Sequence, residues 1–245
     1  MKTIKFLAVI TIAFLSFTSC SDEEEICTTI FYADVDGDGY GDANNPITAC
    51  QQPDNYVDNA DDNDDGQALT SVISATVSNL AAVQTADYST TPPTITGDYV
   101  RFSFETGAAV TDDNWDIAFR GSTIIVNGGS AISSDEPERT GEAGVYLATG
   151  TLADIAEVDT TLFAQDDAAN GYAIATGSGN GWYNYDFTTH LISPIAGTII
   201  IVKTINGTYA KLEILSYYLD ADTTSSSQHY TFNYVYQPNN GLTVF

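Results

Sequence analysis

The side chains with the most regular spacing in this chain are the aspartates of DVDGDGYGD, residues 34–42. Oxygen ligands recur there at the intervals used by a calcium-binding loop: Asp34, Asp36, Asp38, the Tyr40 carbonyl and Asp42. Gly39 stands where such a loop bends sharply. Asn45 stands where a bidentate glutamate is expected, so another carboxylate has to complete the ligand set. The pattern predicts binding of a hard divalent cation, calcium above all.

The surrounding segment, residues 26–66, contains ten aspartates and neither lysine nor arginine. Without a cation these carboxylates would repel one another, and the alternative interpretation is a solvated acidic linker. The segment resembles calcium-binding repeats of the thrombospondin type 3 kind, in which a later acidic cluster folds back onto the loop. Here that cluster is Asp61–Asp65, and the resemblance implies Asp62 and Asp64 as further ligands.

The same resemblance bears on two of the three cysteines. Related segments often have a cysteine in the later acidic cluster, where this chain has Asn63, and this leaves Cys27 and Cys50 as the available pair. In an exported chain a Cys27–Cys50 disulfide would close a short loop and contribute on the order of 3 kcal/mol. Free thiols and pairing between molecules are the alternatives.

The N-terminus has the form of an export signal. Lys2 and Lys5 precede an apolar run, residues 6–14, that is too short to span a membrane. The small residues before Cys20 resemble a lipobox, which implies a signal peptide over residues 1–19 and acylation of Cys20. The alternative is a secreted protein with a free or paired Cys20 thiol. The sequence SDEEE that follows resembles a signal for the outer face of the outer membrane, so we expect membrane attachment through a lipid anchor only.

After the acidic segment the composition changes to Thr, Val, Tyr and Phe with scattered Gly, which favours short strands joined by turns. Residues 198–204 and 209–218 flank Asn206-Gly207, a dipeptide that predicts a hairpin with a type I′ turn. Apolar residues at 199–202 indicate burial on both faces of the first strand. In the second strand, alternation predicts that Lys211 and Glu213 face water.

Further β-prone runs occupy Tyr99–Phe104, Trp115–Phe119 and Ile124–Val126, with a tight connection at Gly128-Gly129. Residues 152–158 are expected to form a helical turn. No long amphipathic helix is recognisable, so the pattern predicts an all-β domain with small helical pieces.

Several motifs in this region carry a family likeness: WDIAFR at 115–120, NGG at 127–129, GWYNYDFTTH at 181–190 with the hairpin that follows it, and YTFNYVYQ at 230–237. In order and spacing they resemble the HmuY family of bacterial haem-binding lipoproteins, over roughly residues 68–245. The resemblance implies an antiparallel, sandwich-like β domain that holds haem outside the cell. It also implies an outer-membrane haem transporter as a candidate partner.

Haem iron needs axial ligands, and after signal removal the chain offers two histidines and no methionine. We expect His190 in a loop beside Trp182 and Tyr183, whose rings could stack on a porphyrin; an ordinary loop histidine is the alternative. His229 precedes a strand that presents aromatic rings on the opposite face, so a solvent-exposed side chain is expected. Family members use histidine pairs or methionines, and this chain departs from that pattern. A tyrosine phenolate is an alternative ligand, but fifteen tyrosines are too many for the sequence to single one out.

Charge limits the partners. Seven basic and 33 acidic residues give a formal charge of −26, and loss of Lys2 and Lys5 leaves five against 33, or −28. This excess argues against nucleic acid and anionic lipid as partners, and it would repel haem propionates within about 8 Å. Four basic residues are candidates to receive a propionate: Arg101, Arg120, Lys203 and Lys211.

Catalytic motifs are absent from the sequence, which has no nucleophile elbow, no HExxH helix and no CxxC pair. We therefore expect a binding protein. Its expected regions are the signal (1–19), the acidic calcium-binding segment (20–66) and the β domain (67–245). The first hypothesis is haem capture at the cell surface for iron acquisition. The second is a calcium-rigidified adhesion or glycan-binding module with exposed aromatics at Trp182, Tyr183 and Tyr185.

Overall fold

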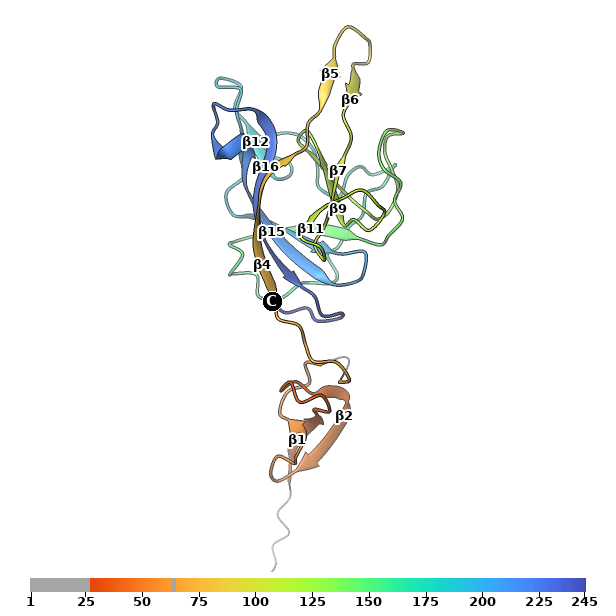
Figure 1. The fold of residues 1–245 in the computed structure, drawn as a ribbon, viewed down its shortest axis with the longest axis vertical. Helices are drawn as coiled ribbons and strands as arrows, with labels where there is room; N and C mark the ends of the chain where they lie inside the picture. The colour runs from red at the N-terminus through yellow and green to blue at the C-terminus, as the bar shows by residue number, and fades with distance from the viewer. Residues whose placement is uncertain (1–26, 63–64) are drawn as a thin grey trace, which may run out of the picture.

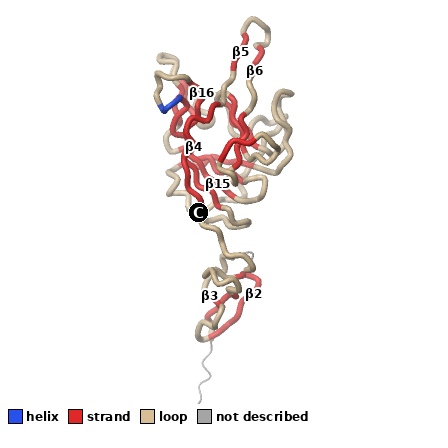
Figure 2. Tube along the Cα trace, in the orientation of Figure 1, coloured by secondary structure: helices blue, strands red, loops and turns tan. Residues whose placement is uncertain are grey.

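The computed structural model describes residues 27–62 and 65–245. The molecule is elongated, with a small N-terminal unit at one end and a larger β domain that extends to the other (Figure 1). The predicted signal peptide, Cys20 and Asp64 lie outside the described residues. Figure 2 shows strands and loops throughout, and the 3₁₀ helix η1 (Leu219–Ala221) is the one helical piece in the described chain. No helix among these residues has the length and apolar character needed to cross a bilayer.

The N-terminal unit is a three-stranded antiparallel sheet in the order β2-β1-β3. Its strands are β1 (Thr29–Ala33), β2 (Asp42–Ala49) and β3 (Tyr56–Val57). A disulfide between Cys27 and Cys50 joins the residues that flank β1 and β2. The aspartate loop connects these two strands, so the acidic segment has a folded framework around its carboxylates.

The β domain contains two larger sheets. The five-stranded sheet has the order β11 (Gly144–Thr149), β14 (Thr198–Lys203), β15 (Tyr209–Tyr218), β16 (Ser227–Gln237) and β4 (Ile73–Ala81). The four-stranded sheet has the order β10 (Thr123–Val126), β9 (Ile117–Arg120), β7 (Val100–Ser103) and β8 (Ala108–Val110). All pairings within both sheets are antiparallel.

The two sheets pack face to face and share one core. Alternate residues of β16 point inward as the sequence predicts, and the Phe232 ring lies 5.4 Å from Phe102 and 5.7 Å from Phe119 of the opposite sheet. Aromatic pairs of this kind add to the stability that comes from burial of their area. The predicted all-β, sandwich-like architecture is therefore confirmed.

Two short hairpins complete the domain. β5 (Thr85–Asp87) pairs with β6 (Thr94–Thr96) in a ribbon that projects from the end remote from the N-terminal unit (Figure 1). β12 (Tyr183–Tyr185) pairs with β13 (Ile192–Pro194) at the same end, and β13 packs against β15.

The β14–β15 hairpin is present, but its turn differs from the predicted type I′. Asn206 has no positive φ, whereas Gly207 has a φ of 82°. The Gly207 amide donates to the Thr204 carbonyl (3.1 Å), and the Thr204 amide donates to the Thr208 carbonyl (2.9 Å). The loop is thus a type I turn followed by a left-handed glycine, the usual three-residue alternative to a two-residue turn.

β14 is buried on both faces as predicted, but the expectation that Lys211 of β15 faces water is wrong. Lys211 is 5% exposed; its Nζ donates to the Ile155 carbonyl (2.6 Å) and lies 4.2 Å from the centre of the Phe245 ring. Residues 152–158 form a single turn and then an extended bridge to the C-terminus instead of a helical piece. This segment covers the outer face of the sheet and buries Lys211.

Candidate functional site

The loop between β12 and β13 carries His190 in a fixed backbone conformation. Two backbone hydrogen bonds close the loop. The Asp186 amide donates to the Leu191 carbonyl (2.9 Å), and the His190 amide donates to the Asp186 main-chain carbonyl (2.8 Å). The Asp186 carboxylate accepts the amides of Thr188 and Thr189, and these bonds lower the pKa of Asp186. His190 has a φ of 58°, a left-handed conformation that this local network stabilises.

The His190 side chain is exposed and contacts one neighbouring hydroxyl. Its Nδ1 lies 2.7 Å from the Tyr185 Oη. The Tyr185 ring is half-buried against the main core, and it makes an edge contact of 5.0 Å with Phe187, which is 80% exposed. The β12–β13 hairpin therefore presents an imidazole, a phenol and a benzyl ring together at the surface.

His229 lies on β16, paired with Ala81 of β4, and it is half-buried, so the expectation of full exposure is only partly met. Its Nδ1 lies 2.8 Å from the Ser227 carbonyl oxygen. Because a carbonyl oxygen only accepts hydrogen bonds, Nδ1 carries the hydrogen and the lone pair of Nε2 is left for another partner. A metal-ligating histidine is commonly oriented in this way.

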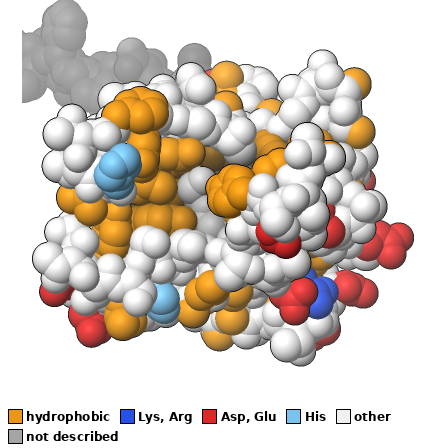
Figure 3. All heavy atoms as spheres, turned by 90° about the horizontal axis from the view of Figure 1, so that it is seen from above, with side chains coloured by type: hydrophobic (Ala, Val, Ile, Leu, Met, Phe, Trp, Pro, Cys, Tyr) orange, Lys and Arg blue, Asp and Glu red, His pale blue; other side chains and the backbone are white. Residues whose placement is uncertain are grey.

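Both histidines lie on the end face opposite the N-terminal unit (Figure 3). In this view, hydrophobic side chains form a broad hollowed area with one histidine at its margin and the other nearby. Partly exposed apolar residues packed on the core at this end include Leu191 and Ile192, and the Ile192 amide donates to the Tyr218 hydroxyl (2.8 Å). No acidic side chain is visible within the hollowed apolar area, whereas acidic side chains lie at the edges of the view and within one half of it, beside other apolar groups. The hollowed area thus differs from the average surface of a chain with a charge of −26.

The acidic segment forms two groups of carboxylates that share Asp36. One group contains Asp34, Asp36 and Asp65, the other Asp36, Asp38 and Asp62, and the candidate oxygens of each lie within 4.8 Å of one another. Asp62 and Asp65 come from the later acidic cluster, which folds back onto the loop. Such groups could hold a hard divalent cation, and exposed carboxylates also gather without one.

The electrostatic environment of Asp36 is unfavourable for its charged form. Its Oδ2 is buried and has no hydrogen-bond partner among the described residues. Burial and the neighbouring charges of Asp38, Asp62 and Asp34 raise the pKa of Asp36. A cation between the carboxylates would remove this repulsion.

Other predicted ligands are arranged differently. The Asp42 carboxylate belongs to neither group and instead accepts hydrogen bonds from Asn44 and Asn45. Tyr40 is 43% exposed on the same loop. Asp65 was absent from the predicted ligands, and its position in the run Asp61–Asp65 was the only sequence signal that could have indicated it.

The acidic segment is attached to the β domain by hydrogen bonds. The Asp38 Oδ2 accepts the Leu69 amide (2.6 Å), so one carboxylate of the second group contacts the linker. The next residue, Thr70, exchanges two hydrogen bonds with the Asn239 side chain near the C-terminus (2.8 and 2.7 Å). The carboxylate groups and the β domain are therefore connected through two consecutive linker residues.

The sequence model of the HmuY protein family matches residues 96–234, more than half of the chain. The chain belongs to the HmuY family. No curated protein matches it.

Three solved structures resemble this HmuY-family chain at low identity. A lipoprotein from Bacteroides fragilis is 15% identical, with 68% of this chain and 91% of that chain covered and a TM-score of 0.40. An HmuY-like haem-binding protein from Bacteroides vulgatus is 14% identical, with 68% and 92% covered and a TM-score of 0.41. The apo HmuY analogue from Tannerella forsythia is 13% identical, with 70% and 100% covered and a TM-score of 0.37.

In this HmuY-family chain, Trp182 and Tyr183 lie in the core beneath the apolar face. Both are buried, and the Trp182 Nε1 donates to the Ser122 carbonyl (2.9 Å). The Trp182 ring also packs at 5.2 Å from Tyr230 of β16. The expectation that these two aromatic residues are exposed is wrong, because both side chains pack into the core, where the Trp182 ring lies 4.9 Å from Tyr183 and 5.7 Å from Tyr217. They support the β12–β13 hairpin and the strands below it.

Three of the four basic residues considered for propionates are engaged elsewhere. Arg101 pairs with Asp113 (3.4 Å), Arg120 is buried and pairs with Asp135 (2.7 Å), and Lys211 is buried under the C-terminus. Lys203 is partly exposed at the end of β14. A haem propionate on the end face would thus be hydrogen-bonded by water or by backbone amides, unless a basic side chain moves to pair with it.

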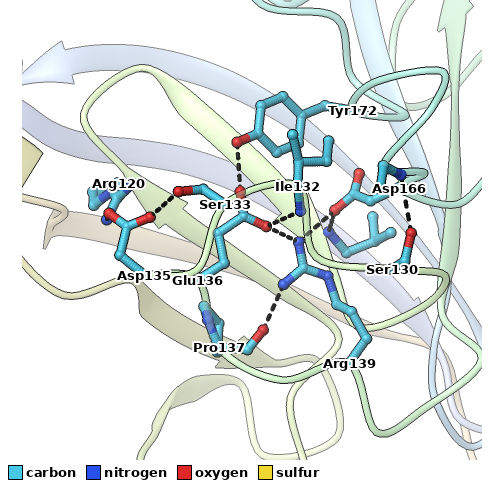
Figure 4. Close-up of polar contacts among 12 residues, drawn as sticks. Arg120, Ser130, Ile132, Ser133, Asp135, Glu136, Pro137, Arg139, Asp166 and Tyr172 are labelled. Atoms are coloured by element: carbon cyan, nitrogen blue, oxygen red, sulfur yellow. Dashed lines mark hydrogen bonds and ion pairs between the residues drawn. The ribbon is translucent and has the colours of Figure 1, made fainter. Parts of the chain in front are cut away.

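A buried ionic cluster joins the connection between β10 and β11 to the connection between β11 and β12 (Figure 4). The Arg139 guanidinium contacts Glu136 (2.8 Å) and Asp166 (2.9 Å), and all three side chains are at most 2% exposed. The Tyr172 hydroxyl donates to Glu136 (2.6 Å). Burial raises the pKa of Asp166 in spite of its contact with Arg139. The paired charges offset the cost of burying one another, although the Arg139 Nε has no hydrogen-bond partner among the described residues.

Proposed function

We propose that this HmuY-family protein binds haem on the hollowed apolar end face. The observation that carries the proposal is the position of both histidines of the chain on that face, around hydrophobic side chains (Figure 3). Haem acquisition is also what the family resemblance implies. The proposed role is binding without catalysis.

Burial of a porphyrin ring on this face would supply most of the affinity. Removal of apolar area from water contributes about 25 cal/mol per Å². His229 offers a free Nε2, and His190 lies at the exposed end of the β12–β13 hairpin. Since the hollowed area itself shows no acidic side chain, a porphyrin seated there would meet repulsion only where its propionates approach the acidic part of the face.

A haemin titration tests the proposal. We expect saturable 1:1 binding with a red-shifted Soret band. Leu191→Asp should weaken binding at least about tenfold, or 1.4 kcal/mol, because it places a carboxylate beside His190 on the apolar face. Leu162→Asp is the matched control, since Leu162 is an exposed leucine outside this core cluster. Absence of saturable binding, or equal losses in the two variants, would rule the face out.

We propose further that the acidic segment binds calcium. Convergence of two carboxylate groups on Asp36, whose buried oxygen has no described hydrogen-bond partner, supports this. Calcium at a hundredfold excess over its Kd should add about 2.7 kcal/mol to the unfolding free energy of the segment.

Calorimetric titration with calcium chloride measures the site directly. Asp36→Asn should weaken binding at least about tenfold, since a shared carboxylate is lost, whereas Asp54→Asn in the same segment lies in neither group and should bind normally. No heat of binding for the wild type would refute the calcium proposal.

The adhesion or glycan-binding alternative has less support. It relied on exposed stacking residues, and Trp182 and Tyr183 are buried. Tyr185 alone of the three remains partly exposed.

A further inference from the structure

Tyr185 differs from the other described tyrosines in having its hydroxyl against an imidazole. The Oη to His190 Nδ1 distance is 2.7 Å, a strong hydrogen-bond contact. The Tyr185 backbone amide donates to the Ser178 Oγ (2.8 Å), and the Tyr185 ring makes an edge contact with Phe187. Both the backbone and the ring of Tyr185 are therefore held in place. Its position at the end of β12 brings the hydroxyl to the margin of the core, beside the exposed His190.

We infer that Tyr185 supplies the oxygen ligand to ferric haem iron and that His190 is the residue that positions and deprotonates it. This inference rests on the proposed haem-binding function and names the ligand within it. Tyrosine oxygen is one of the protein ligands that haem iron accepts.

The backbone around His190 is built to hold the imidazole in this role. A φ of 58° is costly for a residue with a side chain, yet the loop enforces it through the Asp186 carbonyl and carboxylate. In the resulting orientation Nδ1 faces the phenol. With Nδ1 as acceptor, Nε2 carries the hydrogen and does not offer a lone pair to iron.

Tyr185 and His190 together account for the proton that is released when the Tyr185 oxygen binds iron. The Tyr185 O–H bond breaks, its oxygen bonds to iron, and the hydrogen passes to His190 Nδ1. The water or chloride that occupies the axial position of free haemin leaves. The imidazolium that forms is exposed to solvent, and its charge lies beside the new phenolate.

Two conservative variants separate the roles of the residues. Tyr185→Phe keeps the ring contacts and removes the oxygen. His190→Asn keeps an acceptor near the position of Nδ1 and suits a left-handed backbone, since asparagine tolerates this conformation. Tyr88→Phe is the control, because Tyr88 is 81% exposed at the tip of the β5–β6 ribbon.

The experiment compares haemin with metal-free protoporphyrin by fluorescence and absorption titration, together with resonance Raman spectra of the haemin complexes. We expect tyrosinate vibrations in the wild type and in Tyr88→Phe, and their loss in Tyr185→Phe. In His190→Asn they should appear only at raised pH, because an amide accepts the hydrogen bond but not the proton. Tyr185→Phe should lose haemin affinity by more than about 100-fold but retain protoporphyrin affinity. His190→Ala should lose about 10- to 100-fold, as is typical when a partner of a metal ligand is removed.

Absence of tyrosinate bands from the wild type, or retention of the wild-type haemin spectrum in Tyr185→Phe, would overturn the ligand assignment. Tyrosinate bands at neutral pH in His190→Asn would overturn the role of His190 as the base. In each of these cases protoporphyrin binding would leave the haem-binding proposal standing. Failure of the wild type to bind either porphyrin would instead refute that proposal itself.

Discussion

At the scale of single residues, the family motifs serve the fold more than the binding face. Asn127 of the NGG motif is fully buried; its amide nitrogen donates to the Trp115 carbonyl (2.9 Å), and its oxygen accepts the Thr140 amide (2.8 Å). A Cβ on Gly128 would lie 2.0 Å from the Ala143 carbonyl oxygen, so no side chain fits there. The Asn127 side chain thus joins the backbone at Trp115 to the backbone at Thr140, and Gly128 lets the chain pass close to Ala143.

Asp116 of the WDIAFR motif predicts a pH dependence of stability. Its carboxylate is 2% exposed and accepts the amides of Phe104 and Ile205, and burial raises the pKa of Asp116 from 3.8 to about 6. A raised acid pKa means that the folded state binds a proton more tightly than the unfolded state. The stabilising contribution is therefore present below pH 3.8 and is lost as the pH rises through about 6.

The loss corresponds to about 3 kcal/mol of unfolding free energy over the whole window, from well below pH 3.8 to above pH 6, and most of it falls between pH 4 and pH 7. Urea unfolding of Asp116→Asn should lack this dependence, so its stability relative to the wild type should increase as the pH rises. Asp98→Asn at an exposed position is the control and should run parallel to the wild type. A pH-independent difference between Asp116→Asn and the wild type would contradict the prediction.

At the scale of elements, each face of the β14–β15 hairpin owes its burial to a different neighbour. The inner face packs on the four-stranded sheet, and the outer face is covered by residues 152–163 and the C-terminal Phe245. The four consecutive apolar residues of β14 match this double covering. Lys211 of β15 fits it because its amine finds the Ile155 carbonyl and the Phe245 ring.

The turn of this hairpin yields a second stability prediction. Gly207→Ala should destabilise the domain by about 1–2 kcal/mol, because an L-residue in the left-handed region clashes with its own backbone. Asn206→Ala should cost less, since Asn206 has no positive φ and its side chain makes one exposed hydrogen bond, to Glu105. Denaturant unfolding measures both. Equal costs at the two positions would indicate the type I′ turn instead.

At the scale of the whole molecule, the described chain begins at one end and the apolar face lies at the other (Figure 1). The acidic unit and its linker stand between them. If Cys20 is acylated, as the sequence predicts, this arrangement directs the apolar face away from the membrane. A haem transporter in the same membrane is the partner we propose for such a surface protein.

Replacement of the anchor tests this arrangement. Cys20→Ser should release the protein from the membrane fraction, because two or more acyl chains are needed for stable attachment. Its haemin affinity should be unchanged, since Cys20 lies outside the described β domain. Protease treatment of intact cells reports the orientation: an outward-facing wild-type protein is digested. Membrane retention of Cys20→Ser would exclude the lipid anchor.

The sequence by itself determined the features that depend on neighbours along the chain. Alternation identified the inward face of β16, and a run of four apolar residues identified the doubly buried β14. The spacing of Asp34, Asp36 and Asp38 marked the loop that the later aspartates fold onto. These features are readable because the period of a strand or loop is set by local backbone geometry.

Tertiary structure decided what covers each face and which distant groups meet. Periodicity placed Lys211 toward solvent, but a segment some 55 residues away covers it. The sequence predicted exposure of Trp182, yet its ring packs in the core against Tyr217 and Tyr230. Tyr185 and His190 are only five residues apart, and their contact still depends on the left-handed turn that Asp186 stabilises. Sequence patterns record the polarity of a face, whereas the partner of that face is selected by packing of the folded chain.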